Sequence, residues 1–334
     1  MSHLRRQNES NVPRCGAVTR HPHDLRSKFS VPPWIDRGDR GEMGHSTRSP
    51  CASATFRGFS SRKAPAHGVP FGLFARVAPR RFPARAYDLA RDQLGSIRQI
   101  YLRSNRIVRR GDFADYEETV LLLHGFFQTR NVWEVMEDRL RYDGFGVFSF
   151  DLGGLFSRFN TRTIGELAET IATKIEGVCG RYGLERFHIV GHSKGGLIAR
   201  HYIQHHGGDR RAKSLVTLGT PHHGTPTALI GLWLMAGGVL SRSPYDMLPN
   251  SRFVKLLKRD SFPAGIPITS IYSKHDLVCP APSAMLRPRP GESSMKNVVV
   301  QHVGHTALAY DPGVYRVVRS ELAEASRVWK ERAT

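Results

Sequence analysis

The sequence lacks the features that mark membrane, secreted and disulfide-rich proteins. Its 4 cysteines show neither the paired spacing of a disulfide framework nor the spacing of a metal site, which favours a reducing compartment. No apolar run is long enough for a membrane helix, and no positively flanked apolar stretch has the length of a secretory signal. We therefore expect no transmembrane span and no signal peptide, and a cytoplasmic location is favoured.

Acidic residues are scarce at the N-terminus. Residues 1–86 contain 16 Lys and Arg against 5 Asp and Glu, so this segment carries +11 of the formal net charge of +20. Pro, Gly, Ser and Arg are mixed there without periodicity, and too little apolar surface is available to offset the entropy lost on ordering. We interpret residues 1–86 as a disordered basic extension. A transit peptide and a misassigned start, with initiation at Met43 or later, are the alternatives.

A strong positive charge raises nucleic acid and anionic membranes as partners. The excess is concentrated in the extension, however, and no recognised nucleic-acid-binding motif occurs in the rest of the chain. We therefore expect no specific nucleic-acid partner.

From residue 87 to residue 334, short apolar runs rich in β-branched residues alternate with segments of helical period. This alternation predicts an α/β fold with a doubly wound, mainly parallel sheet covered on both faces. The predicted strands are Thr119–His124, Gly146–Asp151, Phe187–Gly191, Lys213–Gly219, Pro267–Ser273 and Asn297–Val303. The predicted helices are Val132–Arg141, Ile164–Tyr182, Gly195–His205 and Val314–Glu331.

One connection is longer than a strand-to-strand crossover requires. About 45 residues lie between the fourth and fifth predicted strands, which indicates an insertion at about residues 221–264. Its first half contains an apolar run over residues 228–240, too short to cross a bilayer. We expect a cap or lid over the active site that offers a surface to acyl chains; the alternative is a helix buried in the core.

Ser193 lies in Gly191-His192-Ser193-Lys194-Gly195, between the third predicted strand and a helix. A strand, a glycine-bracketed turn and a helix form a nucleophile elbow, in which the strained turn exposes the serine hydroxyl at the top of a sheet. The glycines are needed because a Cβ at either side would collide with neighbouring backbone. The motif predicts an enzyme with a serine nucleophile.

A serine hydroxyl needs an imidazole to take its proton and a carboxylate to orient that imidazole. In an elbow of this kind the acid and then the histidine follow the serine along the chain, in loops after later strands. Asp276 follows the fifth predicted strand, and His305 follows the sixth. We therefore predict a catalytic triad of Ser193, Asp276 and His305. His302 is expected to lie within the last strand.

The oxyanion formed during acyl transfer needs two hydrogen-bond donors. The backbone N–H of Lys194, which follows the nucleophile, is one candidate, and the N–H of Phe126 in the loop after the first strand is the other. Gly125 permits a close approach of that loop to the substrate. A lysine side chain at a helix N-terminus is mildly disfavoured, so that of Lys194 is expected at the rim of the site or without a role. If only its backbone matters, Lys194→Met should keep most of the turnover.

Other polar residues have structural interpretations. His124 is expected to lock its loop by hydrogen bonds.

A helix carries two histidines four positions apart, His201 and His205. We expect them on a solvated face and not at a metal, because no carboxylate ligand accompanies them. His222 and His223 line the cleft or simply begin the insertion. The carboxylates expected to be surface charges or helix caps are Asp246, Asp260 and Asp311.

Five segments in order resemble the α/β-hydrolase lipases and esterases, especially the small bacterial triacylglycerol lipases and class 2 lipases. They are residues 123–126 (LHGF), 191–196 (GHSKGG), 217–224 (TLGTPHHG), 269–276 (TSIYSKHD) and 297–305 (NVVVQHVGH). The resemblance spans about Val120 to Leu308, and its triad falls on the same three residues, Ser193, Asp276 and His305. It implies acyl ester substrates, no cofactor and, in some members, a mobile lid. The basic extension and the lysine in the elbow depart from the family pattern.

The sequence therefore predicts a serine carboxylester hydrolase that acts on a small-molecule or lipid ester through an acyl-enzyme, with possible contact to a lipid surface. No cofactor and no metal are expected, and the oligomeric state is left open. An acyltransferase with the same triad is one alternative, because the same fold hosts many reactions. A non-catalytic binding module is another.

Overall fold

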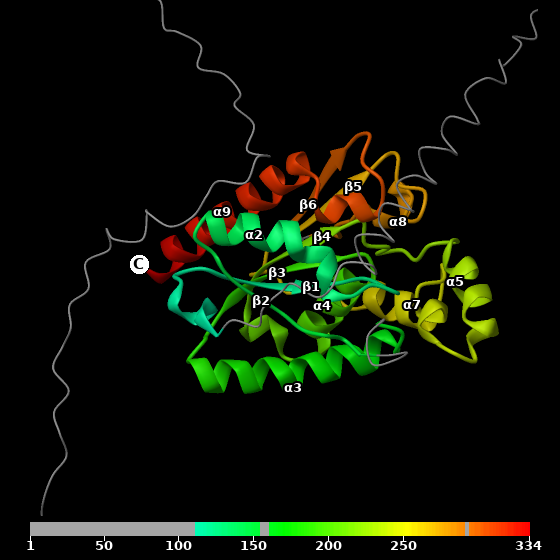
Figure 1. The fold of residues 1–334 in the computed structure, drawn as a ribbon, viewed down its shortest axis with the longest axis horizontal. Coiled ribbons are helices and arrows are strands. Elements are labelled where there is room, and N and C mark those ends of the chain that lie inside the picture. Colours follow the sequence, from blue (N-terminus) through cyan, green and yellow to red (C-terminus); the bar gives the residue numbers. More distant parts are fainter. Residues whose placement is uncertain (1–110, 154–159, 291–293) are drawn as a thin grey trace, which may run out of the picture. The chain divides into compact units, whose positions relative to one another are not determined.

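The computed structural model describes residues 111–153, 160–290 and 294–334. The predicted basic extension, residues 1–86, and the first part of the predicted domain, residues 87–110, lie outside the described residues. Within these described ranges, six parallel strands form one sheet in the order β2-β1-β3-β4-β5-β6 (Figure 1). They are β1 (Thr119–Leu123), β2 (Gly146–Ser149), β3 (Phe187–His192), β4 (Ala212–Leu218), β5 (Ile268–Ser273) and β6 (Met295–Val300). The predicted doubly wound, parallel α/β fold is confirmed.

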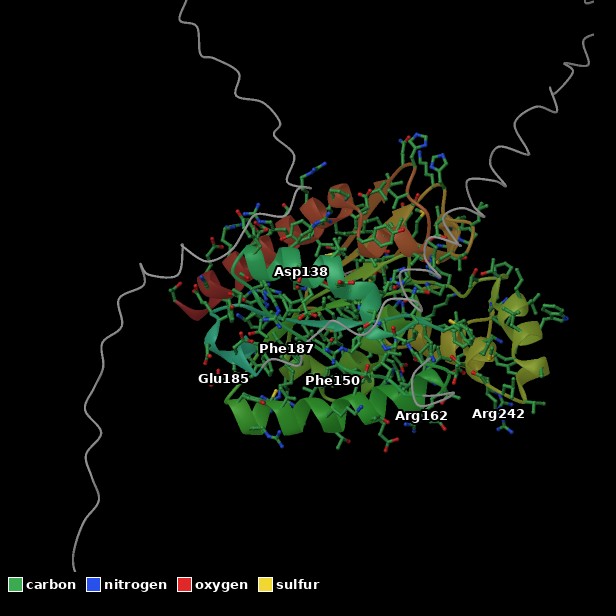
Figure 2. All side chains as sticks on the ribbon, in the orientation of Figure 1. Asp138, Phe150, Arg162, Glu185, Phe187 and Arg242 are labelled. Carbon is green, nitrogen blue, oxygen red and sulfur yellow. The ribbon has the colours of Figure 1, made fainter. Side chains whose placement is uncertain are left out.

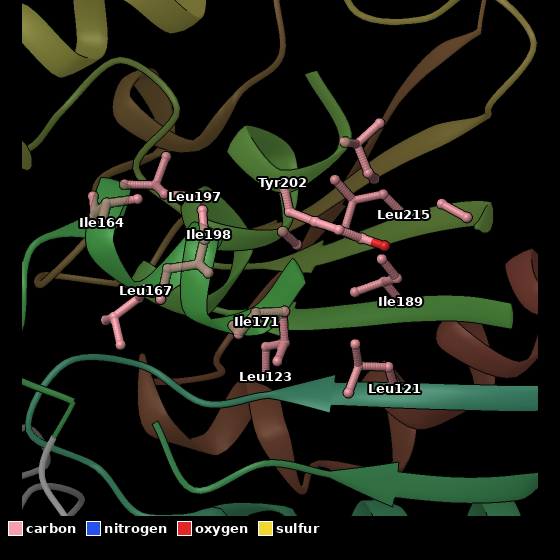
Figure 3. Packing of buried hydrophobic residues seen from close by; sticks show 14 of the residues in the cluster. Leu121, Leu123, Ile164, Leu167, Ile171, Ile189, Leu197, Ile198, Tyr202 and Leu215 are labelled. Atoms are coloured by element: carbon pink, nitrogen blue, oxygen red, sulfur yellow. The ribbon is translucent and has the colours of Figure 1, made fainter. Parts of the chain in front are cut away.

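Successive side chains of the buried strands pack on opposite faces of the sheet. In β1, Leu121 and Leu123 belong to one core cluster, and Val120 and Leu122 belong to the other. Helices α3 (Ile164–Tyr182) and α4 (Lys194–His205) cover the first face, and α2 (Glu134–Tyr142) and α9 (Pro312–Ala333) cover the second. Figure 3 shows the first core, in which leucine and isoleucine side chains from the helices interdigitate with those of the strands. Strands β1, β3 and β5 are buried along their whole length, whereas β6, at the edge of the sheet, has no buried residue.

The long helices begin and end at local signals in the sequence. Thr163 and Glu166 form a capping box at the start of α3, and the helix ends at Gly183, which has a φ of 65°. The backbone N–H of Val314 donates to Asp311 Oδ1 at 2.9 Å, so Asp311 caps α9 as the sequence predicts. These caps explain why the predicted bounds of α3 agree with the structure.

The last strand ends earlier than the sequence predicts. It runs over Met295–Val300, so His302 lies outside it and is exposed, with a φ of 58°. The backbone N–H of His302 donates to His275 Nδ1 at 3.0 Å, and the two rings stack with centroids 4.4 Å apart. The expectation that His302 belongs to the strand is therefore wrong, because a contact with another loop turns the chain at this point.

The segment at residues 221–264 contains short helices. They are α5 (Ala228–Leu234), the 3-10 helix η7 (Ala236–Gly238), α6 (Ser243–Asp246) and α7 (Arg252–Arg259), and Figure 2 labels Arg242 among them. Ala228, Leu232 and Met235 are buried, whereas the larger apolar residues of α5 and the turn after it are exposed: Leu229, Ile230, Trp233, Leu234, Val239 and Leu240. This exposure contradicts the alternative of a helix buried in the core.

The remaining elements are short and connect the layers. They are the helix α8 (Ala281–Ala284) and the 3-10 helices η3 (Asp112–Asp115), η4 (Arg130–Trp133), η6 (Gly208–Arg210) and η8 (Thr306–Ala309). Within the described ranges, no helix combines the length and the apolar character that crossing a membrane requires.

Candidate active site

Ser193 occupies a strained turn between β3 and α4. Its φ of 53° and ψ of −124° are rare for a residue with a side chain, and such strain is characteristic of functional sites. A Cβ at Gly195 would lie 2.1 Å from the backbone oxygen of Leu123, and a Cβ at Gly196 would lie 2.1 Å from Thr220 Oγ1. The glycines are therefore required because neighbouring chain passes too close for a side chain.

Asp276 and His305 form a buried hydrogen-bonded pair. His305 Nδ1 lies 2.7 Å from Asp276 Oδ2. The other carboxylate oxygen, Oδ1, accepts hydrogen bonds from the backbone N–H groups of Val278 and Cys279, both at 2.8 Å. The two backbone donors hold the carboxylate in one orientation, and the carboxylate in turn fixes the plane of the imidazole.

Ser193 and the pair of Asp276 and His305 lie on either side of the backbone at the end of β4. The N–H of Ser193 donates to the oxygen of Leu218 at 2.8 Å, and a Cβ at the next residue, Gly219, would lie 3.2 Å from His305 Nδ1. His192 Nε2 lies 2.9 Å from the backbone oxygen of His305, which ties the two loops together. In the described part of the chain no hydrogen bond joins Ser193 Oγ to His305. Such bonds often tighten only when a substrate is bound.

The loop after β1 approaches the serine closely. A Cβ at Gly125 would lie 2.9 Å from Ser193 Cβ, and the N–H of Gly125 donates to Gln128 Oε1 at 2.9 Å. Among the described residues, no acceptor is found for the backbone N–H of Phe126 or for that of Lys194, the first residue of α4. Both N–H groups are therefore available to a ligand atom beside the serine.

The side chain of Lys194 does not lie at a rim. It is fully buried, and Nζ donates to the backbone oxygen and Oδ1 of Asn160, at 2.8 and 3.0 Å, and to the backbone oxygen of Arg162. Arg162 lies just before α3 (Figure 2). Burial lowers the pKa of Lys194 well below its usual value, and the negative charge of Asp246 opposes this shift. The expectation of a lysine side chain at the rim of the site is wrong, because the side chain is buried.

The histidine beside the loop has a mainly structural environment. His124 is fully buried with Nδ1 3.2 Å from the oxygen of Gly125, whereas Nε2 has no partner in the described ranges. Burial lowers the pKa of His124 to about 4. It is therefore a neutral imidazole near pH 7.

The histidines of α4 differ from each other. His201 is buried, with its ring 5.2 Å from that of Phe253, so the prediction of a solvated face is wrong for this residue, whereas His205 is exposed as expected. His222 is fully buried, with Nε2 3.0 Å from Thr217 Oγ1. Within residues 111–153, 160–290 and 294–334, no group of three or more His, Cys, Asp and Glu residues is arranged to hold a metal ion.

Two carboxylates outside the His–Asp pair have structural contacts. Asp246 Oδ2 accepts from the backbone N–H of Ile164 at 2.9 Å and so links the segment at residues 221–264 to the start of α3. Asp260 pairs with Arg259 at 2.8 Å on the surface. The interpretation as surface charge is right for Asp260, whereas Asp246 caps a helix distant in sequence.

Three polar residues near the serine escaped the sequence analysis. Gln128 accepts from the loop after β1, Thr220 Oγ1 donates to the backbone oxygen of Ser193 at 2.9 Å, and Asn160 contacts both Lys194 and that loop. Gln128 lies two residues after the motif at residues 123–126, and Thr220 lies within the motif at residues 217–224, so their positions were a usable signal. Asn160 belongs to no motif, because its role depends on contacts with segments far away in sequence.

The comparisons with known proteins agree with this architecture. Residues 118–239 match the family model described as the alpha/beta hydrolase fold. No curated protein sequence has a significant similarity to the chain. The chain has an α/β-hydrolase fold, as the resemblance noted in the sequence implies.

Solved structures of lipases and esterases are similar to this chain at low sequence identity. A lipase of Bacillus licheniformis in its mature form has a TM-score of 0.51 and 16% identity, over 61% of this chain and 91% of that chain. Its propeptide form has a TM-score of 0.50 and 15% identity, over 64% of this chain and 52% of that chain. A thermophilic esterase from Thermogutta terrifontis has a TM-score of 0.46 and 19% identity, over 63% of this chain and 91% of that chain. At these identities the similarity to the Bacillus licheniformis lipase, with TM-scores of 0.51 and 0.50, shows the fold alone.

Proposed function

We propose that this protein is a serine carboxylester hydrolase, a lipase or esterase. The observation that carries the proposal is the buried pair of His305 and Asp276, at 2.7 Å, beside the strained turn of Ser193. In this assignment Ser193 is the nucleophile, His305 the general base and Asp276 the acid that orients it. The backbone N–H groups of Phe126 and Lys194 form the oxyanion hole.

The acylation step begins with transfer of the Ser193 hydroxyl proton to His305 Nε2. The serine Oγ forms a bond to the ester carbonyl carbon, and the carbonyl oxygen becomes an oxyanion that accepts from the N–H groups of Phe126 and Lys194. Asp276 stabilises the imidazolium by its bond to Nδ1. When the carbon–oxygen bond to the leaving alcohol breaks, the imidazolium returns the proton to that oxygen, and the acyl group stays on Ser193.

Water completes the reaction. His305 takes a proton from a water molecule, whose oxygen attacks the acyl carbon and forms a second tetrahedral intermediate in the same oxyanion hole. The bond to Ser193 Oγ then breaks, Oγ takes the proton from His305, and the carboxylic acid leaves. In each half of the reaction His305 first accepts a proton and then returns it, so the protons balance without a cofactor.

The insertion at residues 221–264 supplies a candidate surface for the acyl chain. A Cβ at Gly231 of α5 would lie 3.7 Å from the ring of Phe126, and Thr225 Oγ1 donates to the backbone oxygen of Val278 at 2.9 Å. The segment thus borders both the proposed oxyanion loop and the acid loop. Its outward side is apolar, with 79% of Trp233 exposed. We assign it as a cap that contacts apolar acyl chains or a lipid surface.

Hydrolysis of p-nitrophenyl acyl esters tests the proposal. Wild-type protein should release p-nitrophenol, and Ser193→Ala should lower turnover by about four orders of magnitude or more, as deletion of a triad member does. Ser261→Ala, which changes an exposed serine, is the matched control and should keep full activity. A Ser193→Ala variant with wild-type turnover would end the proposal.

Product analysis separates hydrolysis from acyl transfer. With an alcohol or thiol added to the assay, a hydrolase gives mainly the free acid, whereas an acyltransferase gives mainly the transferred ester or thioester. Both products depend on Ser193, so the experiment decides the acceptor and leaves the triad assignment unaffected.

A further inference from the structure

The ammonium group of Lys194 is buried among hydrogen-bond acceptors. A lysine is rarely buried in full unless it is paired, yet within the described residues no carboxylate lies in ion-pair distance of its Nζ. It donates instead to the oxygens described above, two on Asn160 and one on Arg162. A protonated lysine has three donors, and here three acceptors meet them.

The lysine determines which way the Asn160 amide faces. An ammonium group can only donate, so the amide must present its oxygen, Oδ1, to Lys194. The amide nitrogen Nδ2 then faces the loop after β1, where it donates to the backbone oxygens of His124 at 2.8 Å and Gly125 at 3.0 Å. Asn160 is fully buried, so water does not compete for these bonds.

The oxygen of Gly125 belongs to the same peptide group as the N–H of Phe126. A peptide group is planar and trans, so its C=O and N–H point in opposite directions. Holding the oxygen on the side of Asn160 therefore directs the N–H to the other side. A hydrogen bond to the oxygen also polarises the peptide group and strengthens its N–H as a donor.

We propose that the Lys194 side chain is a positioning group that orients the Phe126 N–H of the oxyanion hole through Asn160. Lys194 thus acts at both donors: its backbone N–H is one of them, and its ammonium group holds the other through the asparagine amide. The Lys194 Nζ also lies 5.8 Å from the centroid of the Phe126 ring, which places the positive charge against the loop itself. This inference rests on the proposed function of the site.

Two substitutions break the connection at different atoms. Lys194→Met keeps the backbone N–H and much of the side-chain volume but removes the donors. Asn160→Asp keeps an acceptor for Lys194, and adds a charge opposite the ammonium, but removes the donor to the loop. Each variant should lower kcat by roughly 10²-fold with little change in KM, because loss of one oxyanion-hole donor costs 10² to 10³ in kcat. Inactivation by a fluorophosphonate, which forms a tetrahedral adduct on the serine, should slow in parallel.

The double variant tests whether the two residues act along one path. Lys194→Met combined with Asn160→Ala should lower kcat by about as much as the more damaging of the single variants Lys194→Met and Asn160→Ala, because the second substitution removes a connection already lost. If the fold-losses in kcat of the two single variants multiplied in the double variant, the proposal would be overturned. So would full turnover in both Lys194→Met and Asn160→Asp.

Arg200→Met is the matched control for loss of a buried cation on the same helix. Arg200 donates to the backbone oxygen of Leu257 in α7 at 3.0 Å and to Gln204 Oε1 in α4 at 3.1 Å. It should lower the melting temperature and leave kcat near the wild-type value. A fall in kcat that follows the melting temperature across all variants would show that Lys194 is merely structural. Absence of ester hydrolysis by the wild type would instead reject the proposed function.

Discussion

His305 Nδ1 lies 2.7 Å from Asp276 Oδ2, although 29 positions separate the two residues in the sequence. The carboxylate reaches this position because its other oxygen accepts from the N–H groups of Val278 and Cys279, and a fully buried carboxylate needs such partners. The pair is therefore held in place by contacts within the protein itself. The bond from Asp276 engages Nδ1 of the imidazole and leaves Nε2 as the nitrogen that can act on a substrate.

Asp276→Asn should lower kcat by about 10⁴-fold at neutral pH, with KM little changed. The amide keeps the shape of the carboxylate but holds the imidazole in the wrong tautomer and cannot stabilise the imidazolium. Steady-state hydrolysis of a short-chain p-nitrophenyl ester measures the effect. Asp260→Asn, which removes a surface carboxylate paired with Arg259, serves as control and should keep wild-type turnover. Retention of a tenth or more of kcat by Asp276→Asn would exclude this role.

Gly195→Ala should distort the site and lower the free energy of unfolding, because the added methyl group would lie 2.1 Å from the backbone oxygen of Leu123. Neither group can move without displacing the end of β1, and overpacking of this kind costs typically about 1–3 kcal/mol and occasionally more. Gly177→Ala in α3 is the control, since nothing lies within 4 Å of its added methyl group. It should raise the free energy of unfolding by about 0.5–1 kcal/mol, as alanine does in a helix. Urea denaturation of both variants measures the contrast, and a neutral Gly195→Ala would contradict the packing described here.

Stability should fall as the pH is lowered from 7 to 5. Burial lowers the pKa of His124 to about 4, of His192 to about 3 and of His201 to about 4. The unfolded chain, with histidine pKa values near 6.5, therefore binds more protons than the folded chain in this window, and protonation favours unfolding. Each such histidine contributes a slope of up to about 1.4 kcal/mol per pH unit.

Replacing one of these histidines checks the sign of this dependence. His201→Gln should make the fall in unfolding free energy between pH 6 and pH 5 shallower by up to about 1.4 kcal/mol, because one titrating group is removed. Leu229→Gln changes an exposed residue that carries no titratable group and should leave the slope unchanged. An unfolding free energy that rises from pH 7 to pH 5 in the wild type would contradict the prediction.

The apolar outer side of the insertion should matter for substrates at a lipid surface. A double variant, Ile230→Ser with Trp233→Ser, should reduce hydrolysis of emulsified long-chain esters by about tenfold or more, since burying each such side chain stabilises the contact by about 1.5–3 kcal/mol. Hydrolysis of a soluble short-chain ester should change little. Tyr142→Ser, which changes an exposed aromatic residue on α2, is the control. Equal losses on both substrates would place these residues in folding or chemistry and not at an interface.

Much of the fold was readable from the sequence because local signals are strong. For five of the six strands, both predicted ends lie within two residues of the observed ends. Helix α3 has its predicted bounds, because a capping box marks its start and Gly183 marks its end. The elbow around Ser193 was readable for the same reason, because its glycines stand where a side chain would collide with neighbouring atoms. The last strand was misplaced because His275, on another loop, determines the turn at His302.

The sequence by itself determined the order of the elements, the strained serine turn and the candidates for base and acid, because each depends on residues that are neighbours in the chain. Only the tertiary structure decided where side chains lie when distant segments meet. Lys194 was expected at a rim and is buried against Asn160, and His201 was expected in solvent and is buried against Phe253. Burial depends on which segments fold over a residue, and periodicity along one helix carries no information about them.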